Sequence, residues 1–127
     1  MDITPLIPKG RNIINSYSDS GFKISEEDFS GSIFLSPENV QEINLKESDN
    51  IEEERLLSLL TKNTNSRIEI LLVGTGKKHL HLSPKIKAEY KKIFPDSSID
   101  EMTTSAACRT FNILTLEDRK VAAILLI

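Results

Sequence analysis

The chain of 127 residues has one cysteine, no tryptophan and an aromatic content of only 6 %. A single cysteine cannot close an internal disulfide, so a disulfide-stapled scaffold is excluded and nothing indicates an oxidising compartment. The longest apolar run, residues 121–127, is far shorter than the roughly 20 residues that span a bilayer. The chain opens without a basic cluster ahead of an apolar run, unlike a signal or transit peptide. We therefore expect a cytoplasmic protein whose membrane association is peripheral at most.

Apolar residues make up 39 % of the chain and charged residues 28 %, which is the balance of a globular protein. A chain of this length is expected to fold as a single domain, 1–127, with residues 1–11 as an irregular N-terminal segment. The formal net charge is −3. Because the lysines come without an arginine stripe and the chain is acidic, no nucleic-acid partner is expected.

Charge is unevenly distributed along the chain. Residues 26–54 carry ten acids and one lysine, whereas residues 77–92 carry six lysines and one glutamate. The first interpretation is that both segments form solvated faces, since surface charge mainly sets solubility and long-range steering. The second is that the lysine-rich segment docks an acidic surface of a protein partner, through Lys77, Lys78, Lys87 and Lys91.

Short extended segments dominate the first part of the chain. Alternating apolar residues predict strands at 12–17, 22–24, 32–36 and 40–43, with turn residues such as Ser-Asp-Ser-Gly at 18–21 between them. Four short strands separated by turns predict an N-terminal β-meander.

After residue 50 the spacing of the apolar residues lengthens from that of strands to that of helices. Asp49 or Asn50, Ser83, and Thr103 or Thr104 are expected to cap three helices. Apolar strands are predicted at 68–73, 98–102 and 121–127. Strand–helix–strand–helix–strand units of this kind make right-handed crossovers that cover both faces of a sheet. The sequence therefore predicts an α/β domain behind the meander.

The helix that follows Ser83 has the clearest apolar stripe. Ile86, Tyr90, Ile93 and Phe94 stand at positions i, i+4, i+7 and i+8, which places them on one helix face. We expect all four to face the sheet, so that replacing Ile93 by alanine costs about 2–5 kcal/mol.

A glycine turn, Gly-Thr-Gly at 74–76, follows the strand predicted at 68–73. Glycines in such a turn allow backbone amides to approach a phosphate or carboxylate. Neither common nucleotide motif fits, because His79 stands where the dinucleotide fingerprint needs its third glycine and Leu71 where a P-loop begins. A tight exit turn is the alternative.

If the strands at 68–73 and 98–102 run parallel, this turn and the start of the last helix emerge at one sheet edge. Amides at a helix start carry the positive end of the helix dipole and attract anions. The sequence then predicts a concave site for a small anion, lined by Gly74, Thr75, Gly76, Thr103, Thr104 and Arg109. The alternative is a crevice filled by the protein's own side chains.

The two histidines are separated by one residue, so His79 and His81 share a face of an extended chain. Structural zinc requires four ligands, and no cysteine or acid lies within six residues to complete a set. We therefore expect neither a metal site nor a cofactor, and interpret the histidines as partly exposed loop residues.

Cys108 and Arg109 lie about one turn inside the last predicted helix. A nearby helix start and an arginine lower a thiol pKa, but no base is close in sequence, and free cysteines are mostly small buried apolar residues. We therefore predict no catalytic residue here. Arg109, if buried, requires an ionic partner, for which the candidates are Asp100, Glu101 and Asp118.

Five stretches together resemble a known family. They are residues 21–22 (Gly-Phe), 31–33 (Gly-Ser-Ile), 72–76 (Leu-Val-Gly-Thr-Gly), 102–114 (Met-Thr-Thr-Ser-Ala-Ala-Cys-Arg-Thr-Phe-Asn-Ile-Leu) and 118–123 (Asp-Arg-Lys-Val-Ala-Ala). This pattern is similar to the small uncharacterised α/β domain family that includes mitochondrial complex I (NADH dehydrogenase) assembly factor three, in its bacterial branch. The resemblance runs from about residue 13 to residue 127. Phe111 stands where relatives often have tyrosine.

The resemblance implies a three-layer α/β fold with a central mixed sheet and no established enzymatic reaction. It implies a non-enzymatic protein-interaction module that aids biogenesis of an inner-membrane complex, with a respiratory or inner-membrane subunit as protein partner. The alternative, from the residues themselves, is a small-anion-binding or catalytic domain that uses the crevice at 74–76 and the helix start at Thr103. Fold alone does not decide between them.

Overall fold

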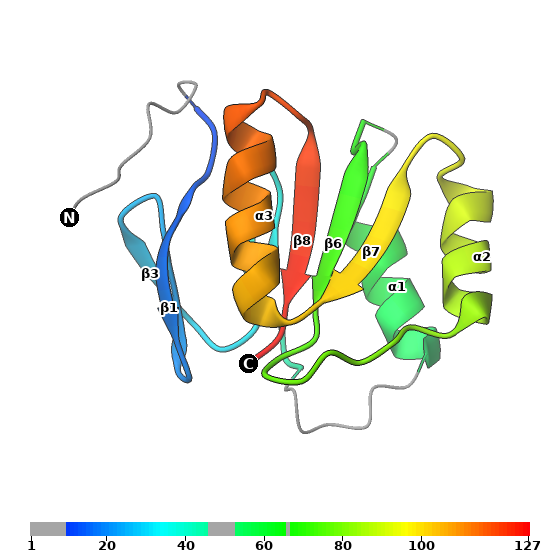
Figure 1. Ribbon diagram of the computed structural model, residues 1–127, viewed down its shortest axis with the longest axis horizontal. Helices are drawn as coiled ribbons and strands as arrows, with labels where there is room; N and C mark the ends of the chain where they lie inside the picture. Colours follow the sequence, from blue (N-terminus) through cyan, green and yellow to red (C-terminus); the bar gives the residue numbers. More distant parts are fainter. Residues whose placement is uncertain (1–9, 46–52, 66) are drawn as a thin grey trace.

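The structure is a computed structural model of the chain, and it describes residues 10–45, 53–65 and 67–127. These residues form eight strands and three helices (Figure 1). In chain order the elements are β1 (Ile14–Ser18), β2 (Gly21–Ile24), β3 (Glu27–Ser30), β4 (Ile33–Leu35), β5 (Val40–Glu42), α1 (Glu53–Asn63), β6 (Ile70–Gly74), α2 (Pro84–Ile93), β7 (Ser98–Met102), α3 (Thr104–Leu116) and β8 (Val121–Leu125).

A mixed five-stranded sheet with the order β5-β4-β8-β6-β7 forms the centre of the domain. Strand β6 runs parallel to both β7 and β8, whereas β4 pairs antiparallel with β8 and β5. All five residues of β8 are buried. This burial explains why its sequence is apolar throughout instead of alternating, as is usual for a strand covered on both faces.

Helices cover both faces of this sheet (Figure 1). One hydrophobic cluster joins α1 and α2 to the sheet through residues such as Leu60, Leu71 and Tyr90. The other joins α3 to the opposite face and contains both Phe111 and Leu72. The predicted three-layer α/β fold with a central mixed sheet is therefore confirmed. Among the helices described, none has the length and apolar character required to cross a bilayer.

The N-terminal meander consists of β1, β2 and β3, which form a separate antiparallel sheet. The prediction for this region is wrong in two respects: β3 was not predicted, and β4 and β5 belong to the main sheet instead of the meander. Strand β3 escapes sequence analysis because its residues, Glu-Asp-Phe-Ser, include one apolar side chain. The turn before it also lacks glycine and asparagine, although Ser25 and Glu26 both adopt positive φ values, 48° and 69°, as tight hairpin turns require.

One asparagine holds the small sheet against α3. The Asn112 side chain accepts a hydrogen bond from the backbone N–H of Ile14 and donates one to the carbonyl of the same residue, both at 2.9 Å. The amide thus satisfies the exposed edge of β1 much as a neighbouring strand would. These two bonds anchor the start of β1 to the C-terminal half of α3. The other end of β1 and the hairpin turn lie near the N-terminus of the helix, at the cavity described below.

Helix α2 begins as predicted, with the Ser83 hydroxyl accepting a hydrogen bond from the amide of Ile86. Ile86 and Tyr90 are buried, and Phe94 packs against the same cluster. Ile93 is 46 % exposed, so its predicted place in the core is wrong. Successive helical residues are about 100° apart, which puts Ile93 on the margin of a stripe centred on Tyr90. The helix also lies at the outer side of the edge strand β7 (Figure 1), where the sheet is too narrow to cover that margin.

We accordingly expect Ile93→Ala to lower the free energy of unfolding by less than about 1 kcal/mol, as is usual for surface positions. The matched change Ile86→Ala, on the buried side of the same helix, is expected to cost about 2–5 kcal/mol. Urea denaturation of both variants measures the difference. Equal losses would show that Ile93 is packed as deeply as Ile86.

The cap predicted for α1 at Asp49 or Asn50 lies outside the described residues. Within the helix, Leu56 and Leu60 are buried and Leu57 and Leu59 are partly buried, as the apolar stripe predicts.

Candidate functional site

The parallel strands β6 and β7 deliver the glycine turn and the start of α3 to the same edge of the sheet, as predicted. The amide of Thr75 donates to the carbonyl of Met102, and the amide of Thr104 donates to the carbonyl of Gly76, both at 2.9 Å. The two chain segments are therefore bonded directly to each other where they leave the sheet.

Thr104 ties a third segment to this junction. Its buried hydroxyl accepts a hydrogen bond from the amide of Gly76 at 2.8 Å and donates one to the carbonyl of Leu126 at 2.6 Å. Gly74 lies directly beneath, and a Cβ there would come within 3.0 Å of the Cα and Oγ1 of Thr104 and of the Leu125 side chain. The glycine is needed because α3 packs against the backbone at this point.

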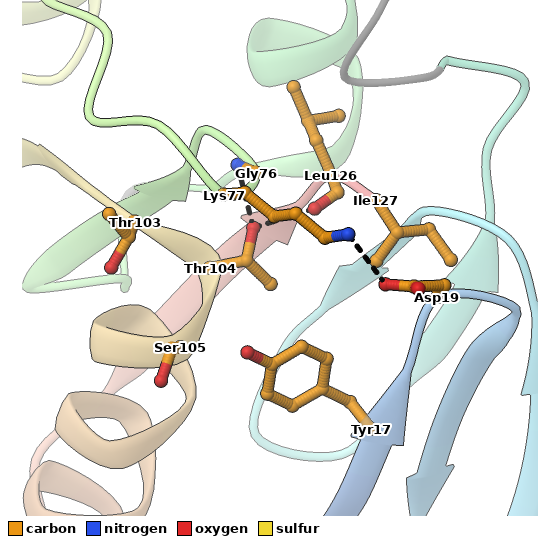
Figure 2. A pocket seen from close by; sticks show the side chains of 9 residues that line it. All are labelled: Tyr17, Asp19, Gly76, Lys77, Thr103, Thr104, Ser105, Leu126 and Ile127. Atoms are coloured by element: carbon orange, nitrogen blue, oxygen red, sulfur yellow. Dashed lines mark hydrogen bonds and ion pairs between the residues drawn. The ribbon is translucent and has the colours of Figure 1, made fainter.

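A cavity of about 420 Å³ opens above this junction, between the β1–β2 hairpin and the N-terminus of α3 (Figure 2). Tyr17 projects into it from β1 and is stacked on Phe22, with ring centroids 5.7 Å apart. Lys77, from the loop after β6, forms an ion pair of 3.4 Å with Asp19 of the hairpin turn at the rim. Ser105 and the chain's last two residues complete the lining. Both members of the ion pair are largely exposed, so it contributes little to stability.

Three of the six residues predicted for an anion site, Gly76, Thr103 and Thr104, line this cavity. The amides of Thr75, Gly76 and Thr104 donate to protein oxygens, as described above. The Thr103 hydroxyl caps α3 by accepting a bond from the amide of Ala106 at 3.3 Å. An anion at this edge would compete with those bonds.

Arg109 lies outside that group and is exposed, so the expected ionic partner is not required. Of the candidate partners, Asp118 forms an ion pair with Arg11 at 2.6 Å, and Glu101 pairs with Lys87 at 2.8 Å. The expected pairing of Arg109 is therefore not found within the described part of the chain.

The four lysines predicted to dock a partner differ in their surroundings. Lys77 and Lys87 form the ion pairs just described, and the Lys91 ammonium donates to the carbonyl of Ser97 at 3.2 Å. Lys78 is exposed in the loop after β6. Lys78 and Lys91 are therefore the two whose charge can be changed without breaking an ion pair to a described residue.

Cys108 is buried in the cluster beneath α3. Burial raises the pKa of its thiol to about 12, because the thiolate would lose its hydration there. The nearby arginine and helix start do not activate it, in agreement with the expectation of a small apolar core residue.

We therefore expect iodoacetamide to leave Cys108 unmodified in the folded protein near pH 8, because the thiolate is the nucleophile and its population is negligible so far below the pKa. Unfolding in urea restores an ordinary thiol pKa of about 8.5 and exposes the side chain, so one adduct is then expected. Mass spectrometry of the intact chain counts the adducts. Rapid labelling of the folded protein would contradict the burial of this side chain.

Sequence analysis missed three residues that shape the cavity: Tyr17, Asp19 and Asn112. The first two lie in the β1–β2 hairpin, whose position depends on bonds between Asn112 and a residue 98 positions earlier in the chain. A contact of that separation leaves no local pattern. The stretch containing Asn112 entered the sequence resemblance, and this was the one available indication.

The fold and cavity define a class: a three-layer α/β domain with a small antiparallel sheet packed beside its last helix. The chain belongs to the family described as protein of unknown function (DUF498/DUF598), whose sequence profile matches residues 14–126. That range contains every described helix and strand, since β1 begins at Ile14 and β8 ends at Leu125. The resemblance drawn from the sequence is thereby confirmed.

A curated relative and two solved structures illustrate the family. The NADH dehydrogenase (ubiquinone) 1 alpha subcomplex assembly factor 3 of Mus musculus is 34 % identical over 113 residues, which are 89 % of this chain. The chain spans 59 % of the length of that relative.

Among solved structures, one described as an outer membrane protein from Bartonella henselae is 34 % identical, with a TM-score of 0.72 over 95 % of this chain and 98 % of that one. A Mth938-like domain from Bordetella pertussis is 24 % identical, with a TM-score of 0.77 over 99 % of this chain and 92 % of that one. At that identity, the second structure establishes the fold alone.

Proposed function

We propose that this domain is a non-enzymatic protein-interaction module that helps assemble a respiratory NADH dehydrogenase at the inner membrane. The observation that carries the proposal is the 34 % identity, over 89 % of this chain, to a mammalian assembly factor of that complex. The domain would act from the cytoplasmic side, as a peripheral protein in contact with a subunit of the complex.

The chemistry of the site supports binding over covalent catalysis. The Thr104 hydroxyl is held between two backbone groups, and the Thr75 hydroxyl donates to the carbonyl of Lys78 at 2.6 Å. The Cys108 thiol is buried, with a raised pKa. These three groups thus serve the fold, whereas a nucleophile must be free to reach its substrate.

Deleting the gene in its native cell tests the proposal. The amount of assembled NADH dehydrogenase in the membrane is expected to fall, while succinate dehydrogenase, which is assembled separately, stays unchanged. Activity staining of native gels measures both complexes. Restoration by the wild-type gene completes the test, and an unchanged amount of assembled NADH dehydrogenase in the deletion strain would overturn the proposal.

Charge reversal tests the lysine surface as the docking face. The double change Lys78→Glu and Lys91→Glu is expected to reduce capture of membrane-complex subunits roughly tenfold, since each exposed pair lost or opposed contributes about 0.2–1 kcal/mol. Capture by the wild type is expected to weaken with added salt, because exposed charges are screened beyond about 10 Å at 0.1 M. Lys87 is left unchanged, because reversing it would place a second carboxylate against buried Glu101.

The matched control reverses Lys62 and Lys120, two exposed lysines outside the 77–92 segment. It changes the net charge by the same amount, so a loss of capture confined to the first double variant assigns docking to the lysine surface. Equal capture by both variants would remove the lysine surface from the proposal.

A further inference from the structure

Three side chains with metal-binding atoms converge at the end of β7. His79 and His81 come from the loop after β6, and Glu101 comes from β7, twenty residues beyond the second histidine. One ligand atom from each of the three lies within 4.8 Å of the others. The sequence suggested no such set, because the acid that completes it is close in space and distant in the chain.

The spacing is near that of a bound ion. Zinc bonds of about 2.0–2.2 Å in tetrahedral geometry place neighbouring ligand atoms about 3.4 Å apart. The Nδ1 of His81 lies 3.5 Å from Oε1 of Glu101, and the two imidazole rings have centroids 4.6 Å apart. Both imidazole side chains are exposed, so they are free to rotate toward a common centre with the carboxylate.

The loop that carries the histidines is fixed at its base. The Thr75 hydroxyl donates to the carbonyl of Lys78 at 2.6 Å and accepts from the amide of Leu80 at 3.1 Å, so it holds the backbone on both sides of His79. Preorganised ligands favour binding, because less conformational freedom is lost when the ion is bound.

Glu101 is an anchored carboxylate. Its side chain is only 5 % exposed, and Oε2 lies 2.8 Å from the Lys87 ammonium, while Oε1 faces His81. Among the described residues, no donor meets Oε2 at hydrogen-bonding angles. Burial acts to raise the pKa of Glu101, but the Lys87 ammonium and the His81 ring outweigh it and keep the carboxyl ionised at neutral pH.

We propose that His79, His81 and Glu101 bind one divalent transition-metal ion of the zinc class. Two imidazoles and a carboxylate suit zinc and similar ions, whereas calcium and magnesium prefer oxygen ligands alone. Both histidines are exposed, so the remaining coordination position faces solvent and is open to water or to a side chain of a binding partner. The site does not depend on the proposed assembly function.

Titration of the full chain with zinc chloride at neutral pH tests the site. The chain contains two histidines, so every imidazole NMR signal reports on this site. Both rings are expected to shift together and to saturate at one ion per chain. His81→Ala and Glu101→Gln are each expected to raise the zinc Kd by at least about tenfold, which is the lower range for losing even an outer-shell partner of a bound metal.

Asp100→Asn is the matched control, because Asp100 is an exposed carboxylate of the same strand and side chains alternate between faces along a strand. Its zinc Kd is expected to equal that of the wild type. His81→Ala changes an exposed side chain, so its result stands even where the buried change Glu101→Gln unfolds the protein. Unshifted imidazole signals at millimolar zinc, or equal zinc Kd values for His81→Ala and wild type, would overturn the proposal.

Discussion

Phe111→Ala is expected to lower the free energy of unfolding by about 3–5 kcal/mol, the range found when a large buried aromatic side chain is deleted. Phe111 is fully buried in the cluster that joins α3 to the central sheet and to the small N-terminal sheet. That cluster contains side chains of α3, of the central sheet and of the small sheet. Because three elements surround the space that it would leave, they cannot close that space without losing other contacts.

Ile113→Ala provides the control on the same helix, since this side chain is 55 % exposed. Its expected cost is below about 1 kcal/mol. Urea denaturation followed by circular dichroism gives both values. A loss for Phe111→Ala below about 1.5 kcal/mol, with cooperative unfolding, would show that α3 packs through another face.

Thr104→Val is expected to lower the free energy of unfolding by about 2–5 kcal/mol. Valine has almost the same shape as threonine but has no hydroxyl, so the amide of Gly76 and the carbonyl of Leu126 are left buried without a partner. Each unsatisfied buried group costs about 1–3 kcal/mol. Exchange of the Gly76 amide hydrogen is also expected to accelerate, because its acceptor is gone.

Thr110→Val is the matched control, with the same change of side chain at a half-buried position of the same helix. It is expected to cost less than about 1 kcal/mol, as substitutions away from buried hydrogen bonds usually do. Denaturation and amide exchange of the two variants separate the loss of the hydroxyl from the change in helix propensity. Equal losses would indicate that the Thr104 hydroxyl contributes no special stability.

The second half of the fold could be predicted because its signals are local. Ser83 and Thr103 cap the helices that follow them, as expected from their side chains and positions. Strand β7 occupies the predicted residues, and β8 lies within its predicted range. A cap bonds to an amide three residues away, and a strand buried on both faces is apolar at every position. A short window of sequence therefore contains both signals.

The first half depends on contacts that no short window contains. The β4 sequence predicts a strand but does not reveal that its partner is β8, which pairs Ile33 with Leu125. The histidine cluster, and the wall of the cavity formed by the β1–β2 hairpin, could not be predicted for the same reason. The Asn112 bonds help to hold β1, and with it Tyr17, beside α3. Glu101 meets His81 only because the loop after β6 passes close to the end of β7.

The position of β8 has a consequence for synthesis of the protein. This strand lies in the middle of the sheet, between β4 and β6, yet its residues follow all the others of that sheet in the chain. Ile33 pairs with Leu125, which lies 92 positions later in the chain. On the ribosome, the apolar strands β4 and β6 therefore emerge before the strand that joins them, and the sheet closes only after β8 has left the exit tunnel. Until then the unpaired edges of β4 and β6 stay exposed and prone to aggregation. A chaperone bound to the nascent chain would protect them.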